Sequence, residues 1–211
     1  MDQAVEALLR GGCIVYPTET FYALGAKADD AQALERIFAV KGRPGAKPLP
    51  LIIGDMAQLA LALDEDSRSG RSWPGLACAR ELMERFWPGP LSLVVPMRRD
   101  LPARLADARG FVSVRLTPHP AARELCLRAG TPLAATSANI SGEPPVSDLA
   151  SLNPAVRRAV DAVFQGEPRP AGGLASTVIA PVADREAVVH RVGALPMETL
   201  ARAGFRLTGA S

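Results

Sequence analysis

The chain is poor in the residues that build metal centres and disulfide frameworks. It has three cysteines and two histidines among 211 residues, and no two cysteines stand in a Cys-x-x-Cys pair. An odd number of widely separated cysteines favours neither a disulfide-stapled fold nor a zinc site. The histidines also lack a metal-ligand spacing, so structural or surface positions are favoured for them. We therefore expect a reducing, cytoplasmic location and no metal site built by the protein.

Aromatic residues, excess charge and long apolar runs are scarce as well. Aromatic residues make up 5% of the chain and the formal net charge is +2, so binding of a nucleotide or nucleic acid must come from a local basic cluster. No run approaches the roughly 20 apolar residues of a membrane span, and the beginning of the chain has no basic segment of the secretory type. The phosphate-binding pattern G-x-x-x-x-G-K-S/T is also missing. These features predict no membrane partner and no Walker-type nucleotide loop.

The sequence does contain alternating apolar strands and amphipathic helices. A hydrophobic content of 48% over 211 residues can form one substantial core, so we expect residues 1–211 to form a single domain. The alternation predicts an α/β sheet flanked by helices, whose ligands bind beyond the ends of the strands. The expected strands are 13–16, 49–53, 91–95, 112–116, 132–135, 161–164, 176–179 and 187–191. The expected helices are 2–10, 31–40, 56–63, 77–87, 120–129 and 197–203.

Small polar side chains gather in the segment 136–143, directly after the apolar run 132–135. Hydroxyl groups, amide groups and backbone N–H groups at the end of a strand are typical of an anion site. Ser137 and Asn139 are the candidate ligand-binding residues of this segment. Serine and asparagine also serve very often as turn and capping residues, and that alternative stays open.

A second candidate segment is basic and follows the predicted helix 31–40. Lys41, Gly42, Arg43 and Pro44 are followed shortly by Lys47, so three cations can approach one polyphosphate. The glycine permits close approach of the backbone to a ligand. The alternative is that the two neighbouring cations complement the dipole of the helix C-terminus, which needs no ligand.

Arg115 lies near the end of an otherwise apolar strand, and Arg191 ends another. A guanidinium group inside a protein needs an anionic partner. Arginine geometry suits a two-pronged hydrogen bond to a ligand carboxylate or phosphate, and it equally suits a structural salt bridge. The residue alone does not decide between these alternatives.

Four separated motifs resemble the YrdC-type threonylcarbamoyl-AMP synthase family in order and spacing. They are Y-P-T-E-T-F-Y-A-L-G at 16–25, K-G-R-P at 41–44, F-W-P-G-P at 86–90 and S-A-N at 137–139. The likeness runs from about residue 10 to about residue 195. It implies a YrdC-like, twisted, mostly mixed open sheet with a large basic concave cavity, in the short form without a second C-terminal domain.

The resemblance also implies an activity. Members of the family make L-threonylcarbamoyladenylate and pyrophosphate from L-threonine, bicarbonate and ATP, for the threonylcarbamoyladenosine modification of tRNA. The chain would be a nucleotidyltransferase, Mg²⁺ would accompany ATP without a dedicated protein site, and a tRNA threonylcarbamoyltransferase would be the downstream partner. The residues implied to contact threonine are Thr20, Arg115 and Ser176. Those implied to surround ATP are Lys41, Arg43, Lys47, Ser137, Asn139 and Arg191, with Lys41 and Arg43 also catalytic.

Three departures from the family pattern keep other functions open. Ala23 stands in place of the usual glycine, Ile52 occupies a place where many members carry histidine, and the segment 175–180 lacks the proline and aspartate common there. These departures favour, as an alternative, a paralogue without threonine specificity. A second alternative is a non-catalytic module that binds double-stranded RNA or tRNA, although the low net charge and few aromatic residues count against it.

Overall fold

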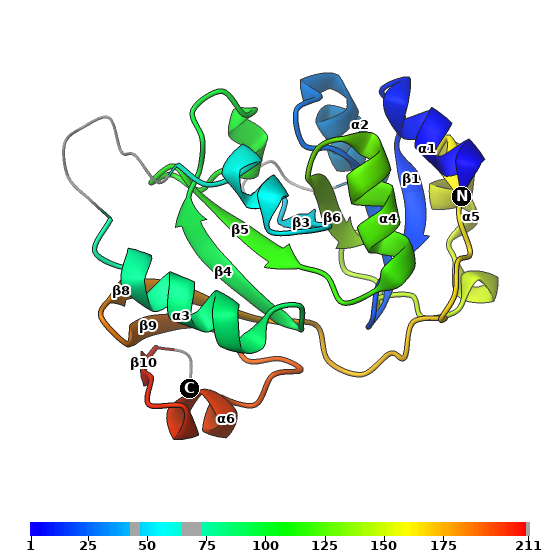
Figure 1. Cartoon of the computed structure of the whole chain (residues 1–211). Helices are drawn as coiled ribbons and strands as arrows, with labels where there is room; N and C mark the ends of the chain where they lie inside the picture. Colours follow the sequence, from blue (N-terminus) through cyan, green and yellow to red (C-terminus); the bar gives the residue numbers. More distant parts are fainter. Residues whose placement is uncertain (43–46, 65–72, 210–211) are drawn as a thin grey trace.

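The computed structural model describes residues 1–42, 47–64 and 73–209, and their strands form one mixed sheet flanked by helices (Figure 1). The strands are β1 (Ile14–Pro17), β2 (Tyr22–Lys27), β3 (Leu51–Ile53), β4 (Leu91–Pro96), β5 (Phe111–Leu116), β6 (Leu133–Ser137), β7 (Ala162–Val163), β8 (Thr177–Ala183), β9 (Glu186–Arg191) and β10 (Arg206–Thr208). The helices are α1 (Asp2–Leu9), α2 (Ala31–Lys41), α3 (Leu76–Phe86), α4 (Pro120–Ala129), α5 (Pro154–Ala159) and α6 (Met197–Arg202). Three short 3₁₀ helices are η1 (Ala57–Leu61), η2 (Ala103–Leu105) and η3 (Leu149–Ser151).

The strands follow the order β10-β9-β8-β4-β5-β3-β6-β2-β1-β7. The pairs β3 with β5, β4 with β8, β1 with β7 and β9 with β10 are parallel, and the other neighbours are antiparallel. The mixed, twisted sheet expected from the sequence is thereby confirmed. The first helix, α1, and the last helix, α6, lie at opposite ends of this sheet (Figure 1).

The sequence pattern located most elements but missed β2, α5 and β10. Half of strand β2 is alanine and glycine, which have low strand propensity, so its sequence carries only a weak strand signal. Its Gly25 allows close packing, because a Cβ atom there would lie 2.2 Å from the backbone oxygen of Ala134. The helix expected at 56–63 is only the 3₁₀ turn η1, and β6 continues to Ser137 instead of ending before the polar segment. Most of the loop expected at 64–75 lies outside the described residues.

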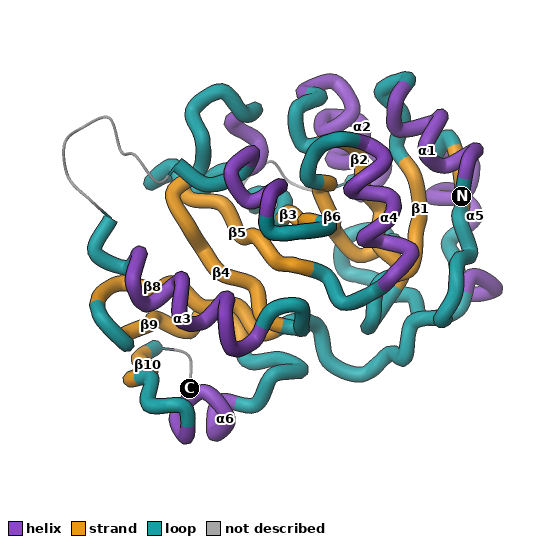
Figure 2. Tube along the Cα trace, viewed as in Figure 1, coloured by secondary structure: helices purple, strands orange, loops and turns teal. Residues whose placement is uncertain are grey.

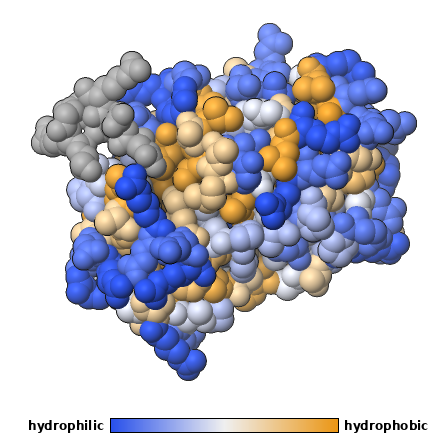
Figure 3. Space-filling model, in the orientation of Figure 1, coloured by the Kyte–Doolittle hydropathy of each residue, from blue (hydrophilic) through white to orange (hydrophobic). Residues whose placement is uncertain are grey.

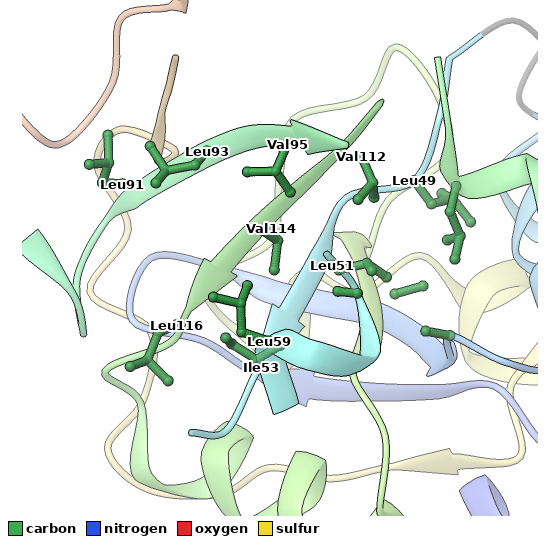
Figure 4. Packing of buried hydrophobic residues seen from close by; sticks show 14 of the residues in the cluster. Leu49, Leu51, Ile53, Leu59, Leu91, Leu93, Val95, Val112, Val114 and Leu116 are labelled. Carbon is green, nitrogen blue, oxygen red and sulfur yellow. The ribbon is translucent and has the colours of Figure 1, made fainter. Parts of the chain in front are cut away.

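Alternation along the central strands separates a hydrophobic core from a polar face. Successive side chains of a strand point to opposite faces of the sheet. When every second side chain packs into the core, the side chains between them must point to the other face. Figure 4 shows how the apolar side chains of the two strands pack together; they are Leu91, Leu93 and Val95 of β4 and Val112, Val114 and Leu116 of β5. At alternate positions of the same strands, Ser92 of β4 and Ser113 and Arg115 of β5 line a cavity.

Helices cover the sheet at several places (Figure 2). Helices α1 and α4 pack against each other and against β1, while α2 packs on β2 and α3 on β8. Helix α4 begins where the His119 side chain caps its N-terminus, with Nδ1 accepting from the backbone N–H of Ala122 at 3.4 Å. On the face drawn in Figure 3, hydrophilic residues predominate and apolar residues form smaller groups among them. None of the helices in the described ranges has the length and hydropathy to span a bilayer.

Candidate active site

A cavity of about 770 Å³ extends along the sheet, with lining residues from β9 through β8, β4, β5, β3 and β6 to β2. Its volume is in the range of small-molecule sites. Cations outnumber acids among the described lining residues, which include a single carboxylate, Glu143. The lining cations are Lys41, Lys47, Arg115 and Arg191.

The cavity brings together the site residues expected from the sequence. The cavity is lined by the four cations named above and by Thr20, Ser137, Asn139 and Ser176. These residues are far apart in the sequence, with 171 positions separating Thr20 from Arg191. Arg43 lies outside the described residues. The contact of each residue with threonine or ATP stays a prediction.

One side of the cavity, which we call the loop wall, consists of Lys41, Lys47 and the segment 137–143. Lys41 ends α2 and is only 4% exposed. Its Nζ donates to the backbone oxygens of Ser137 at 2.6 Å and Asn139 at 2.8 Å, and to Asn139 Oδ1 at 3.0 Å. The backbone N–H of Ser141 donates in turn to the Lys41 oxygen at 2.9 Å. Lys41, the first residue of the K-G-R-P motif, is therefore joined directly to the S-A-N motif.

Hydrogen bonds inside the segment 137–143 fix its own polar side chains. Ser137 Oγ donates to Asn139 Oδ1, and Asn139 Nδ2 donates to the backbone oxygen of Glu143. The Glu143 carboxylate accepts from Asn153 Nδ2 at 2.9 Å. The turn-forming role left open for Ser137 and Asn139 is thus present, at a place where both side chains also line the cavity.

The other side, which we call the strand floor, consists of Ser92, Ser113, Arg115, Ser176 and Arg191. Arg115 is 7% exposed and forms an ion pair with Glu19, whose other carboxylate oxygen accepts from Thr117 Oγ1 at 3.3 Å. Burial lowers the pKa of Arg115 to about 10, so the guanidinium remains charged at neutral pH. The salt bridge left open by the sequence exists, and Arg115 lines the cavity at the same time.

Arg191 is held differently, by neutral acceptors. Its Nε and Nη2 donate to the Ser176 backbone oxygen at 3.0 and 2.8 Å, and Nη2 also donates to Ser176 Oγ at 3.1 Å. Ser176 Oγ lies 3.0 Å from Ser92 Oγ. Within the described ranges no carboxylate forms an ion pair with Arg191, so its charge is available to an anion in the cavity.

The sequence reasoning did not select Glu19, Ser92 or Ser113. The serines interrupt apolar strands at alternate positions, which is a usable signal for a polar face. Glu19 carries no such signal, because its partner Arg115 is 96 residues away in the sequence. Ala23 and Ile52, two departures from the family pattern, also line the cavity, and Ile52 is paired with Arg115 between β3 and β5.

The cysteines are core residues. Cys13, Cys78 and Cys126 are buried and none is among the lining residues of the cavity. Burial raises the pKa of the Cys13 and Cys78 thiols to about 11 and that of Cys126 to about 12. Thiols with raised pKa values are poor nucleophiles at neutral pH. Among the described residues, no three His, Cys, Asp or Glu side chains gather in a metal-binding group.

Known proteins match the chain over most of its length. The sequence profile of the Sua5, YciO and YrdC family, described as telomere recombination, matches residues 6–193. The threonylcarbamoyl-AMP synthase of Bacillus subtilis is 35% identical over 199 residues, which are 94% of this chain and 54% of the relative. The threonylcarbamoyl-AMP synthase of Photobacterium profundum is 32% identical over 167 residues, which are 79% of this chain and 86% of the relative. The chain therefore spans about half the length of the Bacillus relative and most of the Photobacterium one.

Solved structures agree with the sequence matches. The crystal structure of Pyrococcus abyssi Sua5 complexed with L-threonine has a TM-score of 0.84 at 33% identity, covering 97% of this chain and 58% of that one. Escherichia coli YciO has a TM-score of 0.75 at 30% identity, covering 91% of this chain and 88% of that one. On the profile match, the sequence identity and the shared fold together, the chain belongs to the Sua5/YciO/YrdC family.

Proposed function

We propose that this chain is a threonylcarbamoyl-AMP synthase, a nucleotidyltransferase that joins L-threonine, bicarbonate and ATP. The observation that carries the proposal is the meeting, in one cavity, of the buried cation Arg115 with the basic loop wall, in a chain similar to curated threonylcarbamoyl-AMP synthases. Such a cavity has one place for a carboxylate and another for phosphates.

The proposed reaction has two bond-forming steps. The threonine amine attacks the carbon of bicarbonate, giving a carbamate and releasing water. A carbamate oxygen then attacks the α-phosphorus of ATP, the bond from that phosphorus to the bridging oxygen breaks, and pyrophosphate leaves. No covalent bond to the protein is required, so the side chains act by positioning and by stabilising charge.

Each side of the cavity has a role in this proposal. Arg115 binds the threonine carboxylate, with Thr20 and Ser176 beside it. Lys41, Lys47, Ser137, Asn139 and Arg191 surround the nucleotide, together with Arg43. Mg²⁺ enters with ATP, the product passes to a tRNA threonylcarbamoyltransferase, and we place the reaction in the cytoplasm, where ATP and tRNA occur.

The direct test is a substrate-omission experiment. The chain is incubated with ATP, bicarbonate and L-threonine, and pyrophosphate and the acyl-adenylate are measured by mass spectrometry. We expect pyrophosphate release that needs both threonine and bicarbonate. Release at the same rate without either substrate contradicts the proposal.

Two further measurements test the alternatives: the same reaction with L-serine in place of L-threonine, and the binding of tRNA at different salt concentrations. Serine lacks one methyl group, and in an apolar subsite this costs about 1–3 kcal/mol of discrimination. Equal efficiency with serine and threonine favours the paralogue without threonine specificity, to which Ala23 and Ile52 in the cavity would contribute. Tight, salt-sensitive binding of tRNA without ATP turnover favours the RNA-binding module.

A further inference from the structure

Ser92 is a buried hydroxyl on the cavity floor to which neither the sequence motifs nor the proposed function assign a role. It lies in the middle of β4, between the core residues Leu91 and Leu93, and is 4% exposed. A serine at such a position forgoes the packing that an apolar residue would provide, and its hydroxyl must be hydrogen-bonded. Its place in the cavity lining indicates a ligand-directed use.

The hydrogen bonds around Ser92 leave one hydroxyl proton for a ligand. Ser176 Oγ accepts from Arg191 Nη2 at 3.1 Å and lies 3.0 Å from Ser92 Oγ. If Ser92 donates to Ser176, the Ser176 proton is not used in the pair, and if Ser176 donates, the Ser92 proton is not used. A hydroxyl group has one proton and two acceptor lone pairs, so both arrangements leave one donor. Both side chains line the cavity, so that donor can reach an acceptor there.

The charge around the pair favours an anionic acceptor. Arg191 donates to the backbone and side-chain oxygens of Ser176, and within the described ranges no carboxylate forms an ion pair with it. A hydroxyl donor backed by a guanidinium is stronger than an isolated hydroxyl, because the charge polarises the chain of hydrogen bonds. The unit is small, with two hydroxyls and one guanidinium, and suits a compact oxyanion.

The register of the sheet places this unit beside Arg115. Leu93 of β4 is paired with Val114 of β5, so Ser92 and Arg115 lie one residue beyond this pair on the two strands. Both side chains face the cavity. An amino acid whose carboxylate is bound by Arg115 can therefore direct its amine toward the Ser92–Ser176 pair, and reacting atoms must approach to about 3–3.5 Å.

We propose that Ser92, together with Ser176 and Arg191, which the proposed function also places beside threonine and the nucleotide respectively, forms the subsite that binds the one-carbon oxyanion, bicarbonate, next to the amino acid. This inference rests on the proposed function and deepens it, since it adds a substrate-binding residue to the same cavity. Ser92 contacts the bicarbonate oxygen directly when its own proton is free, and supports Ser176 as the donor when it is not.

The kinetic test compares Ser92→Ala with Ser92→Thr. Threonine keeps the hydroxyl group, and its β-branched side chain is well accepted in a strand. The rate of pyrophosphate release is measured while each substrate is varied in turn. Losing one hydrogen bond to a charged group predicts a roughly tenfold or larger rise in the KM for bicarbonate in Ser92→Ala. The KM values for ATP and threonine should change much less, and Ser92→Thr should restore most of the bicarbonate affinity. Ser151→Ala, an exposed serine on η3, is the matched control and should behave as the wild type.

A binding test needs no turnover. Nitrate is a planar monoanion with three oxygens and resembles bicarbonate in shape and charge. Thermal melts in sodium nitrate are compared with melts in sodium chloride at equal ionic strength. We expect nitrate to stabilise the wild type and Ser151→Ala but not Ser92→Ala. Equal stabilisation of wild type and Ser92→Ala overturns the subsite.

The outcomes distinguish the two proposals. An active wild type whose Ser92→Ala variant keeps the wild-type KM for bicarbonate, or loses ATP affinity instead, overturns the Ser92 assignment alone. A wild type that releases no threonine-dependent pyrophosphate overturns the proposed function and the identity of bicarbonate as the anion with it.

Discussion

The loop wall and the strand floor hold their cations in different ways. On the loop wall, Lys41 donates to three oxygens of residues 137 and 139, so its contacts define the shape of the loop itself. On the floor, Arg115 has one acidic partner and Arg191 has one serine, and the strands that carry these residues are also joined by their own ladder pairing. Removing Lys41 should therefore damage both the site and its architecture, whereas removing a floor cation should damage mainly the binding of a ligand.

The largest effect on turnover is expected at Lys41. Lys41→Met keeps the buried apolar part of the side chain but removes the ammonium that holds Ser137 and Asn139. Turnover should fall by roughly 10²-fold, the scale of losing a preorganised electrostatic donor. Unfolding free energy should fall by about 1–3 kcal/mol, because buried oxygens lose their donor. Kinetics and thermal melts of the same variant measure both effects.

Lys47→Met is the matched control, since Lys47 is exposed on the same wall. It should weaken the use of ATP while changing the unfolding free energy by no more than about 0.5 kcal/mol. If Lys41→Met melted at the wild-type temperature, the structural role assigned to its three hydrogen bonds would be wrong.

The contrast between wall and floor also separates what the sequence predicts from what it does not. Strand alternation is local, so Arg115 near the end of V-S-V could be placed in a buried strand from the sequence, and Ser92 and Ser113 could have been found by the same rule. The contact of Lys41 with Ser137 and Asn139 joins residues 96 and 98 positions apart, and no local pattern encodes such a pairing. Only the family resemblance connected these motifs before the structure did.

The missed strand β2 shows a second limit of local patterns. Its alanines and Gly25 fit where β1, β2 and β6 approach closely, as shown by the 2.8 Å between a Cβ at Gly25 and the Tyr16 ring. Small residues in a strand indicate close packing only when the neighbours are known. Strand propensity alone therefore left residues 22–27 without an assignment.

The next effect in size concerns the ion pair on the floor. Glu19→Gln leaves the buried charge of Arg115 without its carboxylate, and breaking a buried pair in this way costs about 3 kcal/mol or more. The Glu19 side chain is 19% exposed, so water should reduce this loss. We expect a lower melting temperature, and a larger stabilisation by added L-threonine than in the wild type, because its carboxylate takes the place of Glu19 beside Arg115.

Arg115→Lys sharpens the same point. Lysine keeps the positive charge but loses the two-pronged geometry, so threonine use should suffer well beyond any change in ATP binding. Calorimetric titration with each ligand separately measures this difference. An unchanged threonine affinity, or an equal loss for both ligands, contradicts the binding of the threonine carboxylate by Arg115.

The smallest effect is expected at His119, which is not among the lining residues of the cavity. Its Nδ1 caps α4, its Nε2 lies 2.7 Å from the Pro168 backbone oxygen, and burial lowers its pKa below the ordinary value near 6.5. Below that ordinary value the unfolded chain binds a proton that the folded chain does not yet bind, so this group removes stability as the pH falls from neutral until the folded-state pKa is passed. His119→Asn keeps a side-chain acceptor for the helix cap and removes the titration. Thermal melts between pH 7 and pH 5 should show a shallower loss of stability in His119→Asn than in the wild type, whereas His190→Asn, at an exposed position, should follow the wild type. Parallel curves for His119→Asn and the wild type would mean that the burial of His119 does not make the stability of the protein depend on pH.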